Sequence, residues 1–85
     1  IQVSNRMMRM LVTGANGLLG QKLVELLQGD ATVFPIATAR RPLAFTQTRG
    51  TFMKMDVANR EEVESVLRTS KPEVIIHTAA MTQVD

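Results

Sequence analysis

The feature that most constrains the fold of this chain is a set of three evenly spaced glycines that directly follows a short apolar segment. Residues 8–13 form this segment, interrupted by Arg9, and Gly14, Gly17 and Gly20 follow it. Glycines at such a junction let the backbone approach a ligand more closely than side chains would permit. A helix beginning there would direct free N–H groups and the positive end of its dipole at the ligand, which suits a phosphate. The stretch therefore predicts a buried strand, a phosphate-binding turn and a helix.

An amphipathic helix is expected after the turn. Its apolar residues recur at helical spacing, whereas the polar residues between them fall on the other side. The predicted apolar stripe consists of Leu19, Leu23, Leu26 and Leu27. Gly29 stands where a C-terminal cap is expected.

A second apolar segment, residues 32–39, predicts another strand. Pro35 lies within this segment and cannot donate a ladder hydrogen bond, so we expect a bulge or a late start to the strand. Residues 42–50 have the composition of a loop, in which Leu43 and Phe45 are candidate apolar anchors.

The remaining elements complete an alternating pattern. Residues 51–55 predict a third strand, and the β-branched run at residues 74–76 predicts a fourth. Between them, Asn59 with Glu62 three positions later forms a capping pattern for a helix that Pro72 ends. The order strand, helix, strand, strand, helix, strand predicts an α/β fold with a parallel sheet, in three layers.

Composition excludes several classes of function. Ten basic and eight acidic residues give a net charge of +2, which with three Phe and no Tyr or Trp does not favour nucleic-acid binding. No apolar run approaches the roughly 20 residues of a membrane span, and no metal-ligand cluster is apparent. The absence of cysteine fits a reducing, cytoplasmic setting.

Several segments together resemble one enzyme family. Residues 13–20 are similar to the cofactor signature of the extended short-chain dehydrogenase/reductase family. Residues 56–57 and 77–80 match two further landmarks of that family at compatible separations. The run at residues 79–85 resembles the A-A-x-T-x-V-D segment of the dTDP-4-dehydrorhamnose reductase-like (RmlD-like) branch. The resemblance covers residues 8–85 and implies the N-terminal part of a Rossmann-type sheet.

The resemblance and the glycine turn together imply a set of ligand contacts. The expected cofactor-binding residues, apart from two arginines, are Gly14, Asn16, Gly17, Leu18, Leu19, Asp56, Val57, Ala79 and Ala80. Thr82 is expected on the substrate side. Asp56 could instead be simply the turn residue before the second helix. His77, the single histidine, is expected to pack or to form a hydrogen bond rather than to act in catalysis.

The end of the second strand bears on which dinucleotide is bound. Folds of this kind use an acidic side chain there to hold the ribose hydroxyls of NAD. Arg40 and Arg41 occupy this position instead, and a guanidinium matches the geometry of a 2′-phosphate. We therefore expect NADP, with NAD as the alternative. The competing interpretation of both arginines is a solvated basic turn.

The chemistry that the family resemblance implies is hydride transfer assisted by a Tyr-x-x-x-Lys pair. This chain contains no tyrosine, so the 85 residues alone are expected to be inactive. Residues 1–7 are expected to be an upstream extension or a cloning remnant, and residues 8–85 a partial NAD(P)-binding domain that stops before the catalytic part.

The expected function is the cofactor-binding portion of a reductase that acts on a nucleotide-linked keto-sugar. Three alternatives stay open. The first is an epimerase or dehydratase of the same family, and the second is a non-catalytic regulatory subunit that binds a dinucleotide. The third, a basic nucleic-acid binder, predicts an affinity that falls steeply with salt. The sequence leaves the oligomeric state undetermined.

Overall fold

The elements of the chain follow the order that the sequence predicts. The computed structural model describes residues 7–78. The elements are β1 (Met8–Thr13), α1 (Leu18–Gln28), β2 (Val33–Ala39), β3 (Thr51–Lys54), α2 (Arg60–Ser70) and β4 (Val74–His77).

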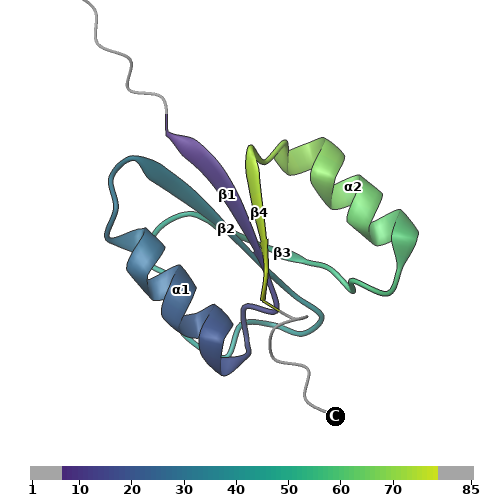
Figure 1. Ribbon diagram of the computed structural model, residues 1–85. Helices are drawn as coiled ribbons and strands as arrows, with labels where there is room; N and C mark the ends of the chain where they lie inside the picture. The colour runs from purple at the N-terminus through teal and green to yellow at the C-terminus, as the bar shows by residue number, and fades with distance from the viewer. Residues whose placement is uncertain (1–6, 79–85) are drawn as a thin grey trace, which may run out of the picture.

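The four strands form one parallel sheet in the order β3-β2-β1-β4 (Figure 1). From β1 the chain moves outward through β2 to β3, and then returns to place β4 on the other side of β1. The direction of winding therefore reverses between β1 and β4. In open parallel sheets, ligands bind in the crevice beyond the carboxyl ends of the strands at such a point.

Alternate residues of the two central strands contact different helices. Leu11 and Ile36, which are paired in the sheet, pack with Val66 of α2. Val12 and Ala37, the next pair, belong to the cluster that contains α1. Because successive side chains of a strand point to opposite faces, α1 and α2 cover opposite faces of the sheet. The predicted three-layer, Rossmann-type α/β fold is confirmed.

Strand β2 runs through Pro35 without the predicted bulge or late start. The register with β1 is one to one, and Pro35 lies opposite Met10. The carbonyl oxygen of Pro35 faces Gly50, where an added Cβ would lie 2.2 Å from it. The nitrogen of an extended residue points to the same side as its carbonyl, so the nitrogen of Pro35 faces away from β1. On that side β3 begins to pair only at Thr51, opposite Ile36. The missing N–H therefore removes no bond to β1.

The buried face of α1 differs from the predicted leucine stripe. Gly20 and Val24 are the buried residues of the helix, and Leu23 and Leu27 pack beside them. Leu19 and Leu26, predicted to be in the core, are 42% and 73% exposed. The buried face is thus rotated relative to the predicted stripe, which did not include Gly20 or Val24.

Both ends of α2 have caps. The side chain of Asn59 accepts hydrogen bonds from the N–H groups of Glu61 and Glu62, as predicted. The carboxylate of Glu62 accepts from the N–H of Asp56, at 2.9 Å, instead of completing a reciprocal capping box. Lys71 ends the helix in the left-handed conformation, with φ of 48°.

The first turn of α1 lies directly against the glycine turn. A Cβ on Gly20 would lie 2.1 Å from the carbonyl oxygen of Gly14 and 2.9 Å from the Cα of Ala15. Both neighbours are backbone atoms, so a side chain could be accommodated only by moving the helix away from β1. The close approach of helix and strand therefore requires glycine at position 20.

Gly20→Ala is expected to lower the free energy of unfolding by about 2 kcal/mol, since a collision with backbone resembles an overpacked core. Urea denaturation of the intact protein measures this change. Gly29→Ala is the matched control, because its φ is −84° and an added Cβ would meet its nearest neighbour at 3.5 Å. Equal stability of the two variants would contradict the close-packing argument.

Candidate functional site

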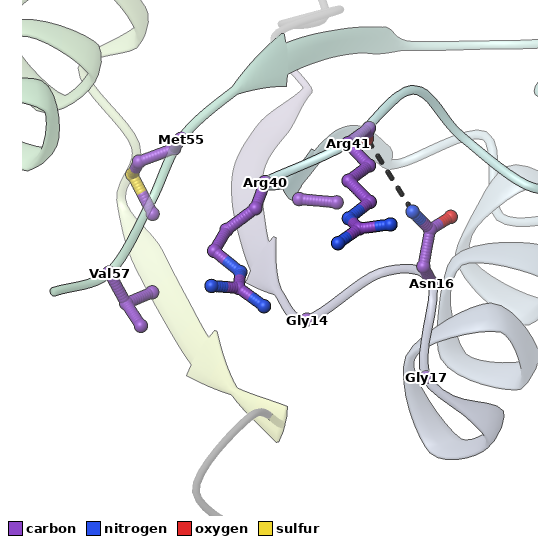
Figure 2. A pocket seen from close by; sticks show the side chains of 8 residues that line it. Gly14, Asn16, Gly17, Arg40, Arg41, Met55 and Val57 are labelled. Atoms are coloured by element: carbon purple, nitrogen blue, oxygen red, sulfur yellow. Dashed lines mark hydrogen bonds between the residues drawn. The ribbon is translucent and has the colours of Figure 1, made fainter.

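A pocket of about 240 Å³ lies at the carboxyl ends of β1, β2 and β3. Residues from three separate segments meet there: the glycine turn after β1, the end of β2, and the segment after β3. The lining residues are Gly14, Asn16, Gly17, Ala39, Arg40, Arg41, Met55 and Val57 (Figure 2). The pocket is thus in the region where a parallel sheet of this topology binds ligands.

The glycine turn is tightly held. Gly14 has a φ of 68°, in the left-handed region that favours glycine, and its carbonyl accepts a 3.0 Å hydrogen bond from the N–H of Gly17. The N–H of Ala15 donates to the carbonyl of Thr38, at 3.0 Å. These bonds fix the turn both to itself and to the end of β2, so the wall of the pocket is preorganised.

The N-termini of the two helices differ in their electrostatics. In α2, Asn59 satisfies two N–H groups, and Glu61 and Glu62 place negative charge in the first turn. In α1, the N-cap is Gly17, no side chain of residues 7–78 accepts from the helix amides, and the first turn contains no acidic residue. The N-terminus of α1 thus keeps its positive potential and is available to an anion beside the pocket.

Two guanidinium groups extend into the same region. Arg40 and Arg41 follow β2 directly, and both are exposed. Figure 2 shows their side chains pointing toward the space in front of Gly14. Within residues 7–78, neither guanidinium forms an ion pair or hydrogen bond. The pocket therefore combines a helix N-terminus with two cations that have no counterion among the described residues.

Arg49, the third arginine of the segment between β2 and β3, has a different role. Its guanidinium donates to the carbonyls of Gln28, at 3.3 Å, and Val33, and contacts that of Leu27 at 3.5 Å. Two of these residues are at the C-terminus of α1, where carbonyl groups lack helical partners. Arg49 therefore caps the helix.

The end of β4 is tied to the glycine turn. The hydroxyl of Thr78, which is fully buried, donates to the carbonyl of Thr13 and contacts that of Gly14 at 3.3 Å. His77 Nδ1 and Thr13 Oγ1 share a hydrogen bond of 2.6 Å. The hydrogen-bonding role expected of His77 is confirmed, and this contact helps to fix β4 beside β1.

The structure brings together six of the residues predicted to bind a cofactor. Those that line the common pocket are Gly14, Asn16, Gly17, Arg40, Arg41 and Val57. The pocket is not lined by Leu18 or Leu19, whose side chains point outward from α1 and are 80% and 42% exposed. Ala79, Ala80 and Thr82 lie outside the described residues.

Asp56 takes part in a turn before α2, and its expected ligand role stays a prediction. Its Oδ1 accepts a 2.9 Å hydrogen bond from the N–H of Ala58, and its carbonyl accepts from the N–H of Asn59. Asp56 does not line the pocket, whereas its neighbours Met55 and Val57 do. The turn thus presents the residues on either side of Asp56.

Two lining residues, Ala39 and Met55, were not predicted as ligand contacts. The N–H of Met55 donates to the carbonyl of Ala39, at 2.9 Å, so the two strand ends are side by side. Both residues are apolar and carry no chemical signal of their own. Their position at the carboxyl ends of adjacent strands is the signal that could have identified them.

The described part of the chain, residues 7–78, contains neither a membrane-spanning helix nor a metal-binding cluster. Neither helix there has the length and apolar content needed to cross a membrane. No group of three or more His, Asp or Glu side chains among residues 7–78 could hold a metal ion.

Comparison with protein families gives a match over nearly the whole chain. Residues 8–85 match the family described as the RmlD substrate binding domain. A dTDP-4-dehydrorhamnose reductase from Aggregatibacter actinomycetemcomitans is 35% identical over 93% of this chain and 23% of its own length. A GDP-6-deoxy-D-talose 4-dehydrogenase from the same organism is 36% identical over 91% of this chain and 22% of its own length. A dTDP-glucose 4,6-dehydratase from Haemophilus influenzae is 27% identical over 93% of this chain and 26% of its own length.

Solved structures of dehydrogenases share the fold. L-threonine dehydrogenase from Clostridium difficile superimposes with a TM-score of 0.70 and 26% identity, over 85% of this chain and 24% of its own. Uronate dehydrogenase from Agrobacterium tumefaciens superimposes with a TM-score of 0.68 and 27% identity, over 84% of this chain and 26% of its own. The chain thus spans about a quarter of the length of the proteins it resembles.

Arg49→Met is expected to lower the free energy of unfolding by about 1–2 kcal/mol, because several carbonyl groups lose their donor. Thermal or urea denaturation measures the change. Arg41→Met is the matched control, since its guanidinium has no partner within residues 7–78, and it is expected to change stability by less than about 0.5 kcal/mol. If the two substitutions had the same effect, the assignment of Arg49 as a helix cap would be wrong.

Proposed function

The chain belongs to the RmlD substrate binding domain family, and we propose that it forms the NADP-binding portion of a reductase acting on a nucleotide-linked keto-sugar. The observation that carries this proposal is the meeting of the uncapped α1 N-terminus with Arg40 and Arg41 in one pocket. The relatives described as a reductase and a dehydrogenase support an oxidoreductase with a nicotinamide dinucleotide.

The pyrophosphate is proposed to lie at the glycine turn. Gly14 and Gly17 line the pocket, and the turn between them brings backbone close to a bound ligand. The N–H groups of Leu18 and Leu19, in the first turn of α1, would donate to phosphate oxygens. Because those contacts come from backbone, the outward direction of both leucine side chains is compatible with a binding role.

The 2′-phosphate of NADP is proposed to lie between the two arginines. An arginine fork binds phosphate through paired, charge-assisted hydrogen bonds, and neither Arg40 nor Arg41 has a competing partner in the described residues. The apolar side chains of Met55 and Val57 provide a surface for the adenine ring on the adjoining wall. The second carboxylate oxygen of Asp56 is proposed to accept from the adenine amino group.

The remaining predicted contacts are proposed on the family resemblance. Ala79 and Ala80 follow β4, where small side chains would let the strand end pass close to the cofactor. Thr82 is proposed on the substrate side. Bound NADPH supplies the hydride, and the residues described above bind and orient it. The proton donor to the reduced carbonyl is proposed to be a tyrosine, which these 85 residues do not contain.

A second candidate is a dehydratase of the same family. The relative described as dTDP-glucose 4,6-dehydratase favours it, although its identity to this chain is lower than that of the reductase. The two functions differ in stoichiometry. A reductase consumes one NADPH for each keto-sugar, whereas a dehydratase leaves the total of reduced cofactor unchanged. Following absorbance of NADPH with a nucleotide keto-sugar and the intact protein distinguishes them.

Calorimetry with NADPH and NADH tests the proposed cofactor site. The intact protein is expected to bind NADPH more tightly than NADH, and Arg40→Ala and Arg41→Ala are each expected to weaken NADPH binding about tenfold because a charge-assisted contact is lost. NADH affinity is expected to change little.

Arg60→Ala is the control for a general loss of positive charge. Arg60 is an exposed residue of α2 that pairs with Glu64, and it lies outside the pocket. This variant is expected to bind both nucleotides as the unchanged protein does. Equal affinity of the unchanged protein for NADPH and NADH would refute the role of the arginines.

A further inference from the structure

We propose that Asn16 is a positioning residue that holds the arginine-bearing segment, residues 40–44, over the glycine turn and thereby sets the preference for a 2′-phosphate. This inference rests on the proposed function. In this proposal the Asn16 side chain does not contact the cofactor directly, but affects its binding by positioning Arg40 and Arg41.

The side-chain amide of Asn16 is occupied at both ends. Its Nδ2 donates to the carbonyl of Pro42, at 3.1 Å. The same nitrogen contacts the carbonyl of Arg41 at 3.5 Å, as the dashed line in Figure 2 shows. Its Oδ1 accepts from the N–H of Ala44, at 2.7 Å. One planar group therefore contacts three residues of a segment that is 25 to 28 residues away in the chain.

No other hydrogen bonds to the backbone of residues 40–44 occur within the described part of the chain. Leu43 and Phe45 pack against the cluster beneath α1, which anchors the far side of the segment. Arg40 to Pro42 are exposed and lack such packing. Asn16 thus fixes the part of the segment from which both guanidinium groups extend.

The backbone that bears Asn16 is itself rigid. Its carbonyl accepts a 2.9 Å hydrogen bond from Nε2 of Gln21, and the preceding residue, Ala15, is bonded to Thr38 of β2. The side chain of Asn16 therefore links a rigid turn to residues 40–42, which have few other contacts. Binding is strengthened when side chains are ordered before the ligand arrives, because less conformational freedom is lost on binding.

Only a side chain with a donor and an acceptor on one planar group satisfies these contacts. Aspartate at position 16 would keep the acceptor for Ala44 but would turn a carboxylate oxygen toward two carbonyls. Alanine removes all three contacts without adding charge, so it isolates the positioning role. A loop released in this way still carries both arginines, but their Cα positions are no longer held over the pocket.

Asn16→Ala in the intact protein is expected to weaken NADPH binding about tenfold and NADH binding less than about twofold, as measured by calorimetry. In an Arg40→Ala/Arg41→Ala background, Asn16→Ala is expected to add no further loss for NADPH. Hydrogen exchange is expected to be faster at the Ala44 amide. Arg60→Ala, which lies outside both the pocket and the loop, is the control and is expected to leave the NADPH/NADH ratio unchanged.

Each outcome decides between the two proposals. If the unchanged protein binds neither nucleotide, the proposed function fails. If it binds NADPH preferentially but Asn16→Ala weakens both nucleotides equally, or neither, the positioning role fails and the cofactor site stands. Asn16→Ser, with a shorter polar side chain, provides the same comparison should the alanine variant not fold, and it is expected to shift the ratio in the same direction.

Discussion

The arrangement of this molecule depends on the contact between Gly20 and the carbonyl of Gly14, where a helix lies against a strand end with no side chain between them. That contact places the first turn of α1 directly over the carboxyl end of β1. A longer separation would move the amides of the helix away from the crevice beside the end of β2. The potential at a helix terminus falls off within about one turn, so the distance matters as much as the charge. Close packing at position 20 is therefore a condition for the anion site.

The positive charge at the site distinguishes it from the rest of the surface. The N-terminus of α2 is neutralised by Asn59 and two glutamates, whereas that of α1 begins at Gly17 without a cap. The arginines differ in a similar way, since the Arg49 guanidinium donates to backbone carbonyls whereas that of Arg40 has no partner within the described part of the chain. Positive charge without a partner in residues 7–78 thus gathers at one pocket. A phosphorylated ligand would supply the missing partner.

The sequence predicted the elements well because strands, caps and glycine turns are local features. The predictions were wrong where the environment of a residue depends on a segment that is distant in the sequence. Whether Pro35 disrupts a strand depends on which neighbour its nitrogen faces, and pairing register decides that. Leu26 is exposed because the face with Gly20 and Val24 is the one against the sheet, and the predicted stripe did not include either residue. The pocket residues were predicted where a motif marks them, but the link from Asn16 to residues 41–44 spans two elements and has no sequence signal.

The central claim is that the glycine turn and the first turn of α1 bind the phosphates of a dinucleotide. Amide chemical shifts of the ¹⁵N-labelled intact protein, recorded during a titration with NADPH, test it most directly. We expect the largest changes at Gly17, Leu18 and Leu19, with the amides of Glu61 and Glu62 at the capped N-terminus of α2 unaffected. Unchanged signals in the glycine turn at saturating NADPH, or equal changes at both helix N-termini, would contradict the account.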